Sequence, residues 1–220
     1  TARKYYIALA SAFETAKRWN IIAANPFRSV EKPKVSEIQP AYFSKTDFQL
    51  LIKEMADNDF QELCLCAVST GLRLGELTAL QWTDIDFVRK TIFVQNRETF
   101  TTKSRRNRVV AMSEQLWRLL AMRKEKAICE LVFHNSGKRL GENYVSKTFK
   151  QHVRKVGLNE KLHFHSLRHT FATWLVVGGV SIYEVQKLLG HSSVQMTEIY
   201  AHLVASELHS AVNKIDLRLN

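Results

Sequence analysis

Three histidines and one arginine lie close together in the stretch HFHSLRHTFATW, residues 163–174. On a helix drawn at about 100° per residue, the apolar side chains of this stretch form one stripe, and Arg168 lies about 40° from its centre line. A guanidinium at the border of a buried face is costly unless an anion meets it. The pattern therefore indicates either an ion pair with an internal carboxylate or an anionic ligand held at the start of a helix. Three imidazoles, from His163, His165 and His169, also allow a zinc site, but no acidic residue or cysteine accompanies them here.

A second arginine has similar surroundings in the stretch STGLRLGELTAL, residues 69–80. Arg73 follows the helix-breaking pair Thr70-Gly71 and lies among leucines. Glu76 can pair with this arginine or steady the turn. Two guanidinium groups in apolar surroundings, in one basic chain, indicate a shared anion.

The charge balance of the chain favours a polyanionic partner. The 220 residues include 32 Lys and Arg against 21 Asp and Glu, a formal net charge of +11 at pH 7. This excess predicts a nucleic acid partner in preference to an acidic small molecule. The alternative is a generally basic protein without a ligand. Because 45% of the residues are hydrophobic and 24% are charged, we expect an ordinary globular chain with a buried core.

Cysteine usage and hydropathy indicate the compartment. Cys64, Cys66 and Cys129 are odd in number and suit neither a disulfide framework nor a zinc knuckle. No apolar run reaches the length that spans a bilayer. We therefore expect a cytoplasmic protein in a reducing environment, with no membrane partner. The first residues lack an initiator Met and a signal peptide, so we expect the chain to be part of a longer protein.

Periodicity predicts a mainly α-helical protein with a small antiparallel β-sheet, an α+β fold. Helices are expected at residues 3–24, 45–55, 60–69, 74–80, 113–126, 143–156, 166–177, 181–189, 193–201 and 207–217. Strands are expected in a hairpin over residues 84–96 that turns at Arg89-Lys90, at 107–112 and at 131–133. The segments 181–184 and 192–195 both match the capping box, and Gly190 is placed to end the helix before His191.

The domain boundary is expected near residue 37. Residues 25–40 contain all 3 prolines and show no periodicity, which is typical of a linker. The chain therefore divides into residues 1–37 and residues 38–220.

Further polar side chains are ambiguous when each is taken alone. Lys103 lies in the basic run between the second and third strands, which is either a solvated hairpin or a lysine that reaches into a groove. Tyr200 follows His191 in LLGHSSVQMTEIYAHL, and a single tyrosine is usually a core or surface aromatic. Asp84 and Asp86 form a D-x-D pair that suits a metal, but we favour polar residues flanking a strand.

Together these segments resemble the tyrosine recombinase, or phage integrase, family. The resemblance is carried by TGLRLGEL, the hairpin lysine, HSLRHTFAT, LLGHSS and IYAHL, which lie in this order along the chain. The six family residues are Arg73, Lys103, His165, Arg168, His191 and Tyr200. The resemblance implies the catalytic-domain fold for residues 38–220, preceded by the last helix of a truncated core-binding domain and a linker. One departure is Ala111, where many members have proline, and we expect no consequence for the site.

The resemblance also implies a reaction and a role for each residue. Tyr200 would attack a DNA phosphate to form a 3′-phosphotyrosine, and His165 would accept its proton. Arg73, Arg168 and His191 would hold the non-bridging oxygens. Lys103 would protonate the departing 5′ oxygen. Neither ATP nor a metal ion nor another cofactor is needed for this chemistry.

The implied partner is double-stranded DNA, bound by a homo-oligomer, a tetramer, encoded by a bacterium, a phage or a mobile element. Residues 204–217 have helical spacing and either pack on their own subunit or exchange to a neighbour. Two other functions remain at this point. One is a DNA-binding protein that keeps the fold and no longer cuts, and the other is a type IB topoisomerase.

Overall fold

The computed structural model describes residues 2–33, 39–95 and 107–201. It contains two compact units, Thr1–Gln39 and Pro40–Asn220. The predicted boundary near residue 37 and Lys103 both lie outside the described residues, as does the expected tail helix 207–217. Within the described ranges, no helix combines the length and the apolar character needed to cross a bilayer.

The N-terminal unit is one helix with a short return segment. Helix α1 (Ala2–Arg18) is shorter than the predicted helix over residues 3–24. It stops because Asn20 adopts a left-handed conformation (φ 57°), and the amides of Asn20 and Ile21 then donate to the carbonyls of Lys17 and Ala16. This pairing is the Schellman motif, which closes a helix. The 3₁₀ turn η1 (Pro26–Arg28) follows it.

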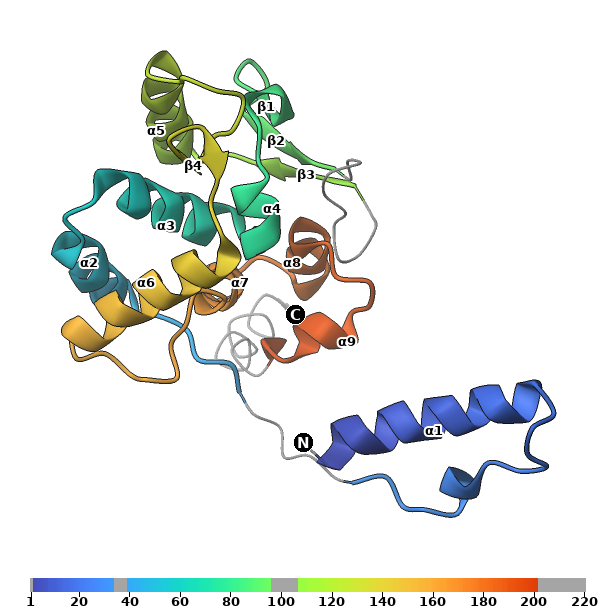
Figure 1. Cartoon of the computed structure of the whole chain (residues 1–220). Coiled ribbons are helices and arrows are strands. Elements are labelled where there is room, and N and C mark those ends of the chain that lie inside the picture. The colour runs from blue at the N-terminus through green and yellow to red at the C-terminus, as the bar shows by residue number, and fades with distance from the viewer. Residues whose placement is uncertain (1, 34–38, 96–106, 202–220) are drawn as a thin grey trace, which may run out of the picture. The chain divides into compact units, whose positions relative to one another are not determined.

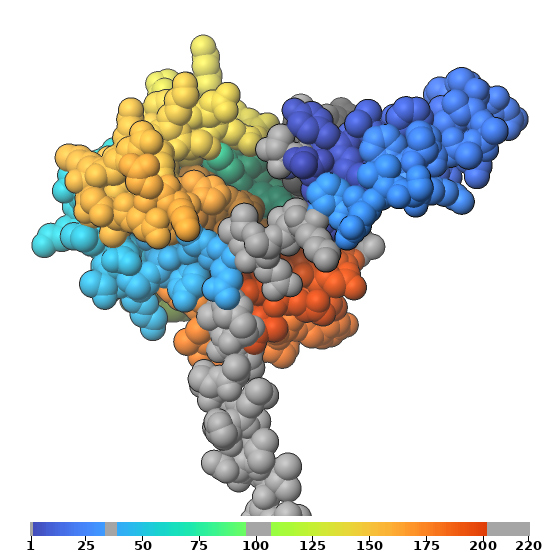
Figure 2. Space-filling model, turned by 90° about the horizontal axis from the view of Figure 1, so that it is seen from below, coloured from blue at the N-terminus to red at the C-terminus, as the bar shows by residue number. Residues whose placement is uncertain are grey.

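In the part of the chain that the structure describes, the larger unit is mainly helical, with two small antiparallel sheets (Figure 1). Its helices are α2 (Lys45–Glu54), α3 (Asn58–Thr70), α4 (Leu74–Thr78), α5 (Glu114–Glu125), α6 (Glu142–Lys155), α7 (Ser166–Val177), α8 (Ile182–Leu189) and α9 (Gln195–Glu198), with the 3₁₀ turn η2 (Trp82–Asp84). Helix α3 contacts α4, α5 and α7, and α8 contacts α7, α9 and strand β3. Helices α2 and α6 contact each other and lie side by side on one face (Figure 2).

The main sheet has three strands in the order β1-β2-β3, with β1 (Ile85–Asp86), β2 (Thr91–Val94) and β3 (Arg108–Ala111). The hairpin turns at the predicted position, where Lys90 has a positive φ of 52°. The register pairs Ile92 with Val110 and Val94 with Arg108. Because side chains alternate along a strand, Arg108 lies on the same face as the buried Val110.

Two predictions were wrong in this unit. The strand expected at 131–133 is not formed; instead Leu131 makes a single bridge with Gln81, and the two-stranded sheet comes just after it, with β4 (His134–Asn135) and β5 (Lys138–Arg139). The second capping box is also absent. Ser192 donates to the sulfur of Met196, and α9 begins only after Val194, which is already in the helical region.

The local signals around α7 and α8 are confirmed. Helix α7 covers the predicted residues 166–177 and ends at Gly178, and Ser181 and Glu184 form the predicted capping box. Gly190 ends α8 with a left-handed φ of 64°. Helix α7 is buried along most of its length because it lies between the large core and a smaller apolar cluster. The smaller cluster consists of Phe171, Ala172, Val176, Val185, Leu189 and Tyr200.

Candidate active site

Arg168 is buried in the middle of the unit, with 3% of its surface exposed. Its Nη1 donates to the carbonyl of Gly71 at 2.6 Å, and its Nη2 donates to the carbonyl of Leu189 at 2.7 Å. The guanidinium therefore joins the end of α3 to the end of α8. Burial, and then the nearby Arg73, lower the pKa of Arg168 to about 9, so this side chain is still charged at pH 7.

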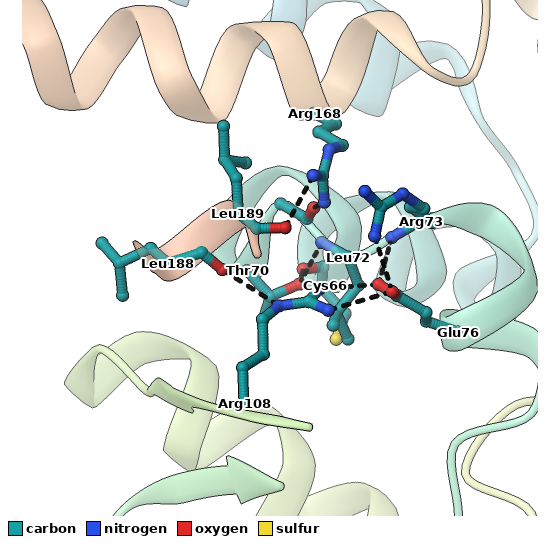
Figure 3. A network of polar contacts seen from close by, with 10 residues as sticks. Cys66, Thr70, Leu72, Arg73, Glu76, Arg108, Arg168, Leu188 and Leu189 are labelled. Carbon is teal, nitrogen blue, oxygen red and sulfur yellow. Dashed lines mark hydrogen bonds and ion pairs between the residues drawn. The ribbon is translucent and has the colours of Figure 1, made fainter. Parts of the chain in front are cut away.

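A buried carboxylate holds two more arginines (Figure 3). Glu76 accepts from the backbone amide of Arg73 at 2.8 Å and from Nη1 of Arg73 at 3.0 Å. Arg108 donates to the same carboxylate through Nη1 at 2.9 Å and Nη2 at 2.6 Å. Although burial opposes it, the two arginines lower the pKa of Glu76, so the carboxylate is ionised. Glu76 thus both pairs with Arg73 and steadies the turn, the two roles expected for it.

Arg108 is the member of this network that the basic run did not reveal. Besides the carboxylate, it contacts the other half of the site: its Nε donates to the carbonyl of Leu188 at 3.1 Å. Its side chain passes close to Gly190, where an added Cβ would lie 2.8 Å from its Cδ. Arg108 therefore connects strand β3, the Glu76 carboxylate and the turn that carries His191. The signal that identifies it is its place on the buried face of β3, two residues before Val110.

His191 lies on the predicted corner between α8 and α9. Its Nδ1 is 2.8 Å from the hydroxyl oxygen of the buried Thr197. Burial lowers its pKa to about 4, with further contributions from Arg168, Arg73, Arg108 and His165 in that order. The neighbouring cationic groups therefore lie close enough to His191 to disfavour the protonated form of its ring. At pH 7 the ring is therefore neutral.

Tyr200 is enclosed, with 2% of its surface exposed. Its hydroxyl oxygen lies 2.6 Å from Nδ1 of His169, a residue next to Arg168 on α7. Burial raises the pKa of Tyr200 to about 12, and the charge of Arg168 acts in the opposite direction. The phenol is therefore close to the arginine pocket and un-ionised in this structure.

His165 precedes α7 and has an exposed side chain. Its ring lies edge-on to that of His169, with centroids 4.9 Å apart. His163 is exposed as well, and its Nδ1 lies 3.0 Å from the carbonyl of Lys161. The three histidines thus have different surroundings. Across residues 2–33, 39–95 and 107–201, no group of three potential ligands is arranged to hold a metal ion.

The D-x-D pair has structural partners. Asp84 accepts from the amide of Gln81 and from the side chain of Gln95. Asp86 accepts from the amides of Val88 and Arg89 at the hairpin turn. These contacts agree with the interpretation of both residues as polar groups flanking a strand.

Of the six family residues, the structure brings Arg73, His165, Arg168, His191 and Tyr200 into one region, from segments far apart in sequence. Lys103 lies outside the described residues. The sequence alone did not reveal that Arg108 bonds to the Glu76 carboxylate. It also did not reveal that His169 contacts Tyr200.

Replacing Gly71 by alanine is expected to destabilise the fold and the site together. Gly71 has a φ of 63°, and a Cβ there would lie 2.4 Å from Cδ1 of Phe171. Left-handed strain and overpacking together predict a loss of about 2–4 kcal/mol in the free energy of unfolding, measured by urea denaturation. Gly157→Ala is the matched control, because Gly157 has a φ of 71° and no atoms within 4 Å of its added Cβ. Equal losses for the two variants would contradict the close packing of Gly71 on Phe171.

Comparison with known proteins decides the family. The sequence model of the phage integrase family matches residues 43–207. The chain belongs to the phage integrase family. It is 31% identical over 219 residues to the tyrosine recombinase XerC of Pediococcus pentosaceus, covering 94% of this chain and 72% of the relative. It is 28% identical over 219 residues to a tyrosine recombinase of Thermosipho africanus, covering 98% and 76%.

Solved structures show the same fold for this chain. A Tn1549 transposon integrase in complex with transposon right end DNA superposes with a TM-score of 0.77 at 22% identity, covering 96% of this chain and 77% of that one. The XerA recombinase gives a TM-score of 0.66 at 24% identity, covering 100% and 78%. The mainly helical fold with small antiparallel sheets is thus confirmed as the tyrosine recombinase catalytic fold. The chain is an enzyme of the class that cleaves and rejoins DNA strands.

Proposed function

We propose that this chain recombines specific DNA sites by attack of Tyr200 on a phosphate held by Arg73, Arg168 and His191. The supporting observation is that four separate segments, namely the α3–α4 turn, α7, the turn after α8 and the turn after α9, bring these groups together. Fixed guanidinium groups meet the charge that develops on the non-bridging oxygens of the phosphate. Because they are tied to carbonyls and a carboxylate, they need little rearrangement when the phosphate arrives.

The remaining roles extend the proposal beyond the described geometry. Lys103, on the segment between β2 and β3, would protonate the departing 5′ oxygen. The exposed His165 would contact the phosphate at the edge of the arginine pocket. Since the phosphodiester bond energy is kept in the 3′-phosphotyrosine, the 5′ hydroxyl of a partner strand can reverse the step without ATP.

The proposed partner is duplex DNA, consistent with the formal charge of +11. The Tn1549 integrase is described in complex with DNA, which supports the same partner here. We further propose that the active species on DNA is a tetramer and that residues 204–217 exchange between its subunits. We also propose that residues 1–37 form the end of a core-binding domain. The enzyme would act in the bacterial cytoplasm.

Trapping on nicked duplex DNA tests the proposal. With a library of nicked duplexes, in the presence of a metal chelator and without ATP, we expect a protein–DNA complex that survives denaturation. Salt-sensitive binding without such a complex would indicate a DNA-binding protein that no longer cuts. Relaxation of supercoiled plasmid without site preference would indicate a type IB topoisomerase instead.

A further inference from the structure

The phenol of Tyr200 lies within hydrogen-bond distance of the imidazole of His169. The Nδ1–Oη distance of 2.6 Å is that of a strong hydrogen bond. Tyr200 is buried and His169 is half-buried, so the bond is shielded from bulk water. A contact of this kind, between a nucleophile and a base, is the geometry that proton transfer requires.

We propose that His169 is a catalytic residue, the group that accepts the proton of Tyr200 when the phenol attacks the phosphate. This inference rests on the proposed function and assigns a role to a residue outside the six family positions. It also divides the histidines of the segment between two tasks. His165, which the family resemblance implies as the proton acceptor, is exposed and would contact the phosphate, whereas His169 faces the nucleophile.

The proposed cleavage step moves one proton from Tyr200 to His169 and exchanges one P–O bond for another. The Oη–P bond forms while the P–O5′ bond breaks, the phenolic proton moves to Nδ1 of His169, and the 5′ oxygen takes a proton from a separate acid. On rejoining, a 5′ hydroxyl attacks the phosphorus and gives its proton back to the conjugate base of that acid, while the P–Oη bond breaks and the imidazolium returns its proton to Oη. In the resting site the ring must carry its own proton on Nε2, so that Nδ1 is free to accept.

The electrostatics of the site keep His169 in the neutral form, which is the form that can accept a proton. Burial lowers the pKa of His169 to about 4, and the nearby cations and rings add to the effect. The groups that face this ring come from α7 and its N-terminus, the turn after α8 and the turn after α9: His163, His165, Arg168, His191 and Tyr200. His169 is therefore neutral at pH 7, and a bound phosphate would raise its pKa by offsetting the surrounding positive charge.

The test compares His169→Asn with the wild-type chain in single-turnover cleavage of nicked duplex DNA. Asparagine keeps a hydrogen-bond acceptor near Oη and cannot take up a proton. We expect cleavage to be slower by about 10²–10⁴-fold, with duplex binding retained. The remaining rate should rise with pH toward the pKa of the phenol, and added imidazole should restore part of it. His169→Gln serves as the second variant if His169→Asn does not fold.

Two controls separate this role from others. His163→Asn, in the same segment but exposed, should cleave at the wild-type rate. A substrate with sulfur in place of the bridging 5′ oxygen, whose leaving group needs no proton, should not rescue His169→Asn. Rescue by that substrate, or cleavage by both His169 variants at the wild-type rate and pH dependence, would overturn the inference. If the wild-type chain forms no adduct, the proposed function itself fails.

Discussion

Replacing Arg168 by alanine is expected to slow DNA cleavage by about 10²–10³-fold, measured as single-turnover adduct formation on nicked DNA. The change removes a charged donor from the pocket that would hold the phosphate. It also leaves the carbonyls of Gly71 and Leu189 without their donors, because both now bond to this guanidinium. Loss of these buried partners predicts a decrease of about 1–3 kcal/mol in the free energy of unfolding.

Arg73→Ala separates the catalytic loss from the structural one. Arg73 has 17% of its side chain exposed, and Glu76 would keep its two bonds to Arg108. We therefore expect a similar loss of cleavage with little change in stability. Arg89→Ala is the matched control, since its side chain is 82% exposed at the hairpin turn. Wild-type cleavage by Arg73→Ala and Arg168→Ala would show that the arginine pocket does not hold the reacting phosphate.

Glu76→Ala is expected to be the most destabilising single change in the site. It would leave the buried side chain of Arg108 and the partly buried side chain of Arg73 beside Arg168 without their shared counter-charge. Removing one partner of a buried ion pair costs about 3–5 kcal/mol, measurable by urea denaturation at pH 7. Cleavage should fall as well, because the positions of both arginines depend on this carboxylate.

The pH dependence of stability gives an independent check on Glu76. Its pKa in the folded state is lowered, so its contribution is present above the unfolded pKa of about 4.3 and is lost as pH falls through the folded value. Glu76→Ala should therefore flatten the acid side of the stability curve. Glu114→Ala is the control, because this exposed carboxylate pairs with Lys90 and Arg118 at the surface, and we expect no measurable change. Equal stability of the two variants would contradict the buried network.

Local signals predicted the elements around the site well. The limits of α7, the capping box of Ser181 and the left-handed Gly190 each depend on a few neighbouring residues, so the sequence determines them directly. The second capping box did not form because other side-chain contacts act on the same segment. Thr197 is buried against His191, and the chain enters α9 only after Val194.

The polar network was harder to predict because its partners are far apart in the chain. Arg108 reaches Leu188 and Glu76 from strand β3, and a basic run in the sequence is usually a solvated surface. Only the alternation of β3, which places Arg108 on the face of Val110, indicates burial. The contact of His169 with Tyr200 depends on how α9 folds back, which helical periodicity does not specify.

The most direct test of the account is to identify the residue that carries the DNA. Several tyrosines are more accessible than the proposed nucleophile: Tyr183 is 59% exposed, Tyr144 54% and Tyr42 44%, against 2% for Tyr200. Peptide mapping of the adduct on nicked DNA should nevertheless place the 3′-phosphate on Tyr200, and Tyr200→Phe should bind duplex DNA without forming an adduct. A phosphate found on any other residue, or an adduct that persists in Tyr200→Phe, would contradict the assignment of this pocket as the site of strand cleavage.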